Sequence, residues 1–166
     1  AFKFRTARPT GTGRAGAWPR RAQGGRIGIM STLHDVPTPA LVLDVDVLEA
    51  NLRRMSVRCK DLGVRLRPHV KTHKCAEVVV EHLKLGVTRF KCATLREAAM
   101  LAEAGASDVL LAYQPVGPNI DRLFGLARLH LKVRFSCIVD CDAVRGALET
   151  LAERHGIPMS VFVDLE

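Results

Sequence analysis

The stretch Val64-Arg-Leu-Arg-Pro-His-Val-Lys71 carries the clearest structural pattern in the chain. Apolar residues or proline occupy every second position, which predicts a β-strand whose other face is basic, with Arg65, Arg67, His69 and Lys71. A central strand of a parallel sheet is usually apolar on both faces. The basic face therefore needs solvent or anionic partners, because an unpaired buried charge costs several kcal/mol.

The sequence around this stretch alternates between predicted strands and predicted helices. Strands are expected to begin near residues 64, 88, 108, 132 and 160, after an earlier short strand at 40–43. Capping boxes are expected at Asp46–Glu49 and Thr94–Glu97, and Asp142 is expected to cap a later helix. This alternation predicts an α/β fold with parallel strands and helical crossovers. It fits either an open doubly wound sheet or part of an eight-stranded barrel, and periodicity does not separate the two.

Composition predicts a folded body behind a basic leader. The chain has 166 residues, of which 48% are hydrophobic, and this excludes a disordered polymer. No run approaches eighteen apolar residues, so no transmembrane helix and no membrane partner are expected. Residues 1–30 hold seven basic side chains, six glycines and no acid, so we expect disorder there. From residue 31 onward, 18 basic side chains face 17 acidic ones, and this near balance argues against a nucleic-acid partner.

Three interpretations of the leader remain open: a mitochondrial-type presequence, a nucleic-acid-binding arm, or a non-native upstream extension with Met30 as the natural first residue. The missing methionine at position 1 favours the extension. Gly11-Thr-Gly-Arg-Ala-Gly16 matches the dinucleotide-binding fingerprint in form. No predicted strand precedes it, so we attribute the match to chance.

The cysteines indicate a reducing compartment. There are five of them, an odd number without CxxC spacing, and each lies in or beside an apolar segment. Free thiols of this kind are typical of a cytoplasmic protein.

Lys71 is the strongest candidate for a catalytic residue. If the apolar face of its strand packs on helices, His69 and Lys71 lie at the carboxyl end of a barrel strand, where barrel enzymes place catalytic groups. Desolvation and the neighbouring His69, His73 and Lys74 would favour a neutral amine, which is a nucleophile for an aldehyde. The alternative is an edge strand marked by Pro68, with a solvated basic side. A zinc site at His69 and His73 is disfavoured, because Pro68 interrupts a helix across them and no acidic residue is near in sequence.

Four motifs occur in a fixed order: Thr38-Pro-Ala-Leu-Val-Leu-Asp44, Arg67-Pro-His-Val-Lys-Thr-His-Lys74, Ala93-Thr-Leu-Arg-Glu-Ala98 and Leu110-Leu-Ala-Tyr-Gln-Pro-Val-Gly117. Over about residues 36–166 they resemble the D-threonine aldolase and D-serine dehydratase group. That group belongs to the alanine-racemase-like, fold-type III pyridoxal-phosphate enzymes. The second motif is the most specific of the four.

The resemblance implies a fold and a site. Residues 31–166 would form the N-terminal part of an incomplete (β/α)8 TIM-type barrel, about five of eight strands, of the alanine racemase N-terminal domain type. The chain would be truncated before the remaining barrel units and the C-terminal β domain. Lys71 would form the Schiff base with pyridoxal 5'-phosphate, and His69 and Thr94 would lie beside this cofactor.

The implied function is a lyase that acts on small D-amino acids, most directly by retro-aldol cleavage of D-threonine-like substrates. D-serine dehydration by the same group is the nearest alternative, followed by a non-catalytic carrier of pyridoxal phosphate; racemisation is more distant. We expect a homodimer when the protein is full length, and an inactive fragment from these residues alone. A divalent metal, if used, would be bound by the C-terminal β domain, so no metal ligands are expected in this chain.

Overall fold

The computed structural model describes residues 2–5, 38–39 and 41–164. The chain divides into two compact units, residues 1–50 and 51–166, and each is treated by itself. Within the described ranges, no helix combines the length and apolar character needed to cross a bilayer.

The first unit contains a small parallel pairing. Strand β1 (Phe2–Arg5) runs beside β2 (Leu41–Asp44) in the register Phe2 to Leu41. Strand β1 lies within residues 1–30, the segment for which disorder is expected, and the rest of that segment lies outside the described residues. The early strand is observed close to the range predicted for it.

Helix α1 (Val45–Asp61) follows β2 without a connecting loop. Its first turn is capped by Asp44, whose Oδ1 accepts the Val47 N–H at 3.0 Å. The predicted capping box at Asp46–Glu49 is wrong, because the backbone already turns at Asp44 and Asp46 lies inside the helix.

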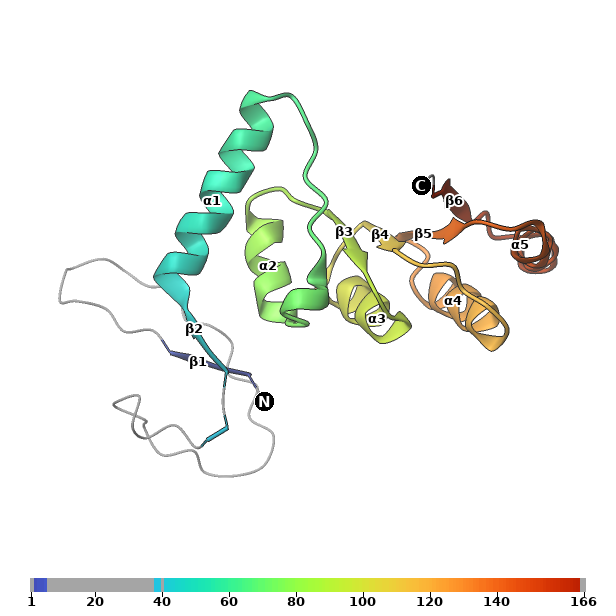
Figure 1. Cartoon of the computed structure of the whole chain (residues 1–166), viewed down its shortest axis with the longest axis horizontal. Helices are drawn as coiled ribbons and strands as arrows, with labels where there is room; N and C mark the ends of the chain where they lie inside the picture. The colour runs from blue at the N-terminus through green and yellow to red at the C-terminus, as the bar shows by residue number, and fades with distance from the viewer. Residues whose placement is uncertain (1, 6–37, 40, 165–166) are drawn as a thin grey trace. The chain divides into compact units, whose positions relative to one another are not determined.

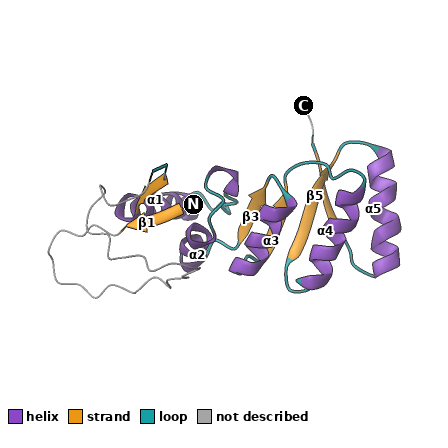
Figure 2. Ribbon diagram, turned by 90° about the horizontal axis from the view of Figure 1, so that it is seen from below, coloured by secondary structure: helices purple, strands orange, loops and turns teal. Residues whose placement is uncertain are grey.

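The second unit is built on a parallel sheet whose strands follow one another in sequence order. These are β3 (Arg89–Cys92), β4 (Asp108–Leu111), β5 (Arg134–Val139) and β6 (Ser160–Val163). The helices are α2 (Ala76–Lys84), α3 (Leu95–Ala104), α4 (Pro118–Leu129) and α5 (Asp142–His155). Figure 1 shows α3 and α4 on the same side of the strands, and Figure 2 shows α3, α4 and α5 side by side.

Strand order separates the two architectures that periodicity left open. A doubly wound sheet reverses its order at a switch point, whereas a barrel adds each strand beside the preceding one. The order β3-β4-β5-β6 shows no reversal, which agrees with the partial barrel that the resemblance implies.

The core lies between the sheet and its helices. Phe90 and Cys92 of β3 are fully buried, as are their register partners Val109 and Leu111 of β4. The alternate positions, Arg89 and Lys91, are half-buried on the other face. One face of β3 is therefore apolar and helix-covered while the other is basic.

The predicted strand over residues 64–70 is present only as an extended arm. It makes a single parallel bridge between His69 and Lys91 of β3, supported by a hydrogen bond from the Lys91 N–H to the Pro68 carbonyl at 2.9 Å. Proline has no N–H to continue the ladder. The arm then closes into the short 3-10 helix η2 (Val70–Thr72).

Two further helix caps were predicted; both helices are observed, but only one of the two caps is. Thr94 caps α3: its Oγ1 accepts the Glu97 N–H at 3.1 Å, and Glu97 Oε2 accepts the Ala93 N–H at 2.8 Å. Asp142 is not a cap, because Cys141 holds the extended cap position and Asp142 is the first helical residue, hydrogen bonded to Arg145 at 3.0 Å.

His82 is expected to make the fold sensitive to acid. It is buried on α2 with its ring edge-on to Phe90, the ring centroids 5.8 Å apart. Burial, followed by the charge of His73, lowers the pKa of His82 to about 4. The unfolded chain therefore takes up the proton first as the pH falls.

We expect the free energy of unfolding to fall by about 2–3 kcal/mol between pH 6.5 and pH 4 through this group, and by about 0.4 kcal/mol or less above pH 6.5. Urea unfolding across that range measures it. His82→Leu should flatten most of the slope and leave the smaller part due to His69 and His73, whose pKa values are also lowered by burial. An unchanged slope in His82→Leu would rule out His82 as its source.

Candidate active site

Lys71 lies on a turn that is anchored by a buried residue, Val70. Val70 is fully buried, and its carbonyl accepts the N–H groups of His73 at 3.1 Å and Lys74 at 2.8 Å. Lys71 itself is exposed, two residues beyond the bridge that joins the arm to β3. Because β3 runs parallel to the arm, this position is the carboxyl end of the sheet, as predicted.

Arg67 fixes the arm to two strands. Its Nη1 lies 2.6 Å from Asp108 Oδ1 of β4 and donates to the Phe90 carbonyl of β3 at 3.2 Å. Both side chains of this ion pair are largely shielded, 21% and 14% exposed, so the pair is tighter than a surface contact. On the basic face of the arm, Arg67 is therefore paired with a carboxylate, while Arg65 and Lys71 are exposed to solvent.

His69 lies directly beside Lys71. Its Nδ1 accepts the Lys71 backbone N–H at 3.2 Å, so the neutral ring carries its proton on Nε2. Burial is the main factor that lowers the pKa of His69, and the positive charges of Lys71 and Lys91 lower it further. A neutral imidazole is therefore favoured beside the lysine near pH 7.

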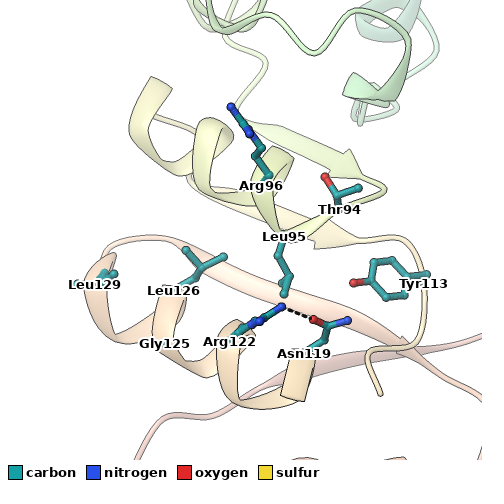
Figure 3. A pocket seen from close by; sticks show the side chains of 9 residues that line it. All are labelled: Thr94, Leu95, Arg96, Tyr113, Asn119, Arg122, Gly125, Leu126 and Leu129. Atoms are coloured by element: carbon teal, nitrogen blue, oxygen red, sulfur yellow. Dashed lines mark hydrogen bonds between the residues drawn. The ribbon is translucent and has the colours of Figure 1, made fainter. Parts of the chain in front are cut away.

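Thr94 lies in a different part of the surface from His69 and Lys71. Together with residues of α3, α4 and the loop after β4, it lines an open depression of about 590 Å³ (Figure 3). The polar groups in this depression include Tyr113 and Arg122, and Arg122 donates to Asn119 at 3.4 Å. Its lining includes neither His69 nor Lys71. The structure brings His69 and Lys71 together, and the role of Thr94 stays a prediction.

Glu97 was not singled out as a site residue from the sequence. It is only 4% exposed, and its Oε1 lies 3.6 Å from Nζ of Lys74, at the end of the turn that carries Lys71. The capping-box pattern predicted its bond to the α3 terminus, but nothing local in the sequence indicates the contact with Lys74.

The thiols are poor alternative nucleophiles. Burial raises the pKa of Cys75 to about 11, of Cys92 to about 12 and of Cys137 to about 11. The thiol form therefore dominates near neutral pH, and a thiol is much less nucleophilic than a thiolate. Across the described residues, no three His, Cys, Asp or Glu side chains gather as metal ligands would.

These features define a class: a partial barrel of parallel strands in sequence order, with an exposed amine at the carboxyl end of its first arm. Residues 43–166 match the family model described as alanine racemase, N-terminal domain. The chain belongs to this family, as the resemblance predicted.

Relatives with known activities agree with this assignment. The chain is 40% identical to D-threonine aldolase of Arthrobacter sp. over 132 residues. This alignment covers 79% of this chain and 34% of that protein. It is 31% identical over 138 residues to D-threo-3-hydroxyaspartate dehydratase of Delftia sp., covering 83% and 36%. It is 32% identical over 144 residues to D-serine dehydratase of Schizosaccharomyces pombe, covering 81% and 34%.

A solved structure shows the same fold. The crystal structure of D-threonine aldolase from Filomicrobium marinum aligns with a TM-score of 0.73 at 36% identity, over 81% of this chain and 36% of that one. The chain thus spans about a third of the length of the relatives it matches.

Proposed function

We propose that this chain is the N-terminal part of a pyridoxal-phosphate-dependent lyase that acts on small D-amino acids. The observation that carries the proposal is the position of Lys71: an exposed primary amine at the carboxyl end of the sheet, on a turn fixed by buried Val70. The names of the relatives support the substrate class, because D-threonine, D-serine and D-threo-3-hydroxyaspartate all carry a hydroxyl on the β-carbon.

The residues around Lys71 fit the cofactor. Lys71 Nζ can bind the aldehyde as a Schiff base, and the positive charges of Lys71 and Lys91 suit an anionic ligand. When bound, pyridoxal phosphate supplies an electron sink for bond breaking at the substrate's α-carbon. His69 holds the Lys71 backbone through its Nδ1, and the Lys71 amine would also be able to donate or accept a proton at the substrate.

Thr94 is the weakest of the proposed cofactor contacts. Its hydroxyl oxygen accepts the Glu97 N–H, which leaves the hydroxyl proton available to an anionic group. Among the described residues, no group of His, Cys, Asp or Glu side chains is arranged to hold a metal ion. A cytoplasmic homodimer with a D-amino acid as its small-molecule substrate remains part of the proposal.

Retro-aldol cleavage is the favoured reaction, since identity to the aldolase, at 40%, exceeds the 32% to the D-serine dehydratase. The test uses the complete protein, meaning the full open reading frame that contains residues 1–166, incubated with pyridoxal phosphate and each substrate. We expect D-threonine to give glycine and acetaldehyde, identified by mass spectrometry.

The other outcomes separate the alternatives. Pyruvate and ammonia from D-serine would assign the dehydratase reaction instead of the aldolase. Tight cofactor binding with no turnover of either D-amino acid would support the carrier. Equal turnover of the L-enantiomers would contradict the D-amino acid assignment.

A further inference from the structure

Glu97 connects the turn that carries Lys71 to the framework of the sheet. It stands in the first turn of α3, and its side chain is 5% exposed. One carboxylate oxygen accepts the Ala93 N–H just after β3, and the other lies 3.6 Å from Lys74 Nζ. A single buried carboxylate therefore contacts both the rigid strand end and the turn.

Two lysines on this turn could react with an aldehyde. Lys71 and Lys74 are three residues apart, and both are exposed to solvent. Within the described part of the chain, Lys74 has a carboxylate partner, and the structure shows no ion pair for Lys71. The contact with Glu97 holds the Lys74 side chain toward α3, so this amine is less free to reach an aldehyde than Lys71 is.

The backbone at Lys74 also needs support. Its φ is +48°, in the left-handed region that side chains other than glycine rarely adopt, and its N–H donates to the Val70 carbonyl at 2.8 Å. Such a conformation persists where surrounding contacts hold it in place. The contact with Glu97 is one such restraint, because it ties the Lys74 side chain to α3.

We propose that Glu97 is a positioning residue, which holds the Lys74 ammonium, fixes the 70–74 turn and leaves Lys71 as the amine that reacts. This inference rests on the proposed function. In the reaction concerned, Lys71 Nζ adds to the aldehyde carbon, the carbonyl oxygen leaves as water, and a C=N bond remains. Burial lowers the pKa of both flanking histidines, His69 and His73, and the negative charge of Glu97 opposes part of that shift.

The first experiment measures which lysine carries the cofactor. The complete protein is loaded with pyridoxal phosphate and treated with borohydride, which delivers hydride to the C=N bond. Peptide mass spectrometry then quantifies the label on Lys71 and Lys74. We expect the parent label on Lys71 and, in Glu97→Gln, a rise of about tenfold in the ratio of Lys74 label to Lys71 label. Glu103→Gln is the matched control, because Glu103 is exposed on the same helix, and it should leave the ratio unchanged.

A second pair of variants tests the same contact without touching the buried carboxylate. Lys74→Arg keeps the cation and Lys74→Met removes it, and since the Lys74 side chain is 61% exposed, both should fold. We expect Lys71 to be labelled at the parent rate in Lys74→Arg and about tenfold more slowly in Lys74→Met.

The results distinguish this inference from the proposed function. The inference is overturned if the label ratio in Glu97→Gln is within twofold of the parent. It is also overturned if Lys74→Met and Lys74→Arg are labelled at equal rates. In either case Glu97 acts as a helix cap alone. If Glu97→Gln does not fold, the Lys74 pair decides. A parent protein that takes no label on either lysine would overturn the proposed function, and the inference with it.

Discussion

Lys71→Ala is expected to lower turnover of the D-amino acid substrate by about 10³-fold or more and to abolish the borohydride-fixed cofactor label. The physical reason is the position of this amine, which no nearby lysine reproduces. Lys74 is engaged by Glu97, and Lys91 lies within β3. Product formation by the complete protein and peptide mass spectrometry measure the two effects.

Two further variants separate the amine from its charge. Lys71→Arg keeps the positive charge but supplies no amine for a Schiff base, so it should be as inactive as Lys71→Ala. Lys132→Ala, at an exposed position between α4 and β5, should retain parent activity. If a reducible label persists at an unchanged site in Lys71→Ala, the assignment of Lys71 is refuted.

Periodicity predicted the faces correctly at the end of the 64–71 stretch, but not at its start, where Val64 of the expected apolar face is 54% exposed. Val70 is fully buried, Arg67 is paired with Asp108, and Lys71 is exposed. It did not predict the hydrogen bonding, since ladder formation depends on a neighbouring strand and on backbone N–H groups. Pro68 lacks one, and the arm keeps a single bridge to β3.

Helix caps also show how far a local sequence pattern predicts the structure. Thr94–Glu97 was predicted correctly, because Thr94 is the one residue of a capping type between β3 and α3. At the start of α1 there are two aspartates two residues apart, and the turn of the backbone selects Asp44 over Asp46. The contact between Lys74 and Glu97 joins distant segments, so it follows from the fold and not from local pattern.

Phe90→Ala is expected to reduce the free energy of unfolding by about 3–5 kcal/mol. The ring is fully buried in the core of the second unit, edge-on to His82. Removing it leaves a cavity beneath the strand whose Phe90 carbonyl accepts a hydrogen bond from Arg67. Because a typical domain is stable by only about 5–15 kcal/mol, this loss brings the variant close to unfolding.

Urea unfolding at pH 7 measures the change, with Leu129→Ala as control, since Leu129 is 78% exposed and its truncation should cost about 0.5 kcal/mol or less. A second effect follows from the contact between Phe90 and His82. The cavity admits water to the imidazole, so the pKa of His82 should rise from its lowered value and the acid sensitivity assigned to His82 should shrink. A cost for Phe90→Ala no larger than that for Leu129→Ala would contradict this description of the core. An unchanged loss of stability between pH 6.5 and pH 4 would show instead that other groups exclude water from His82.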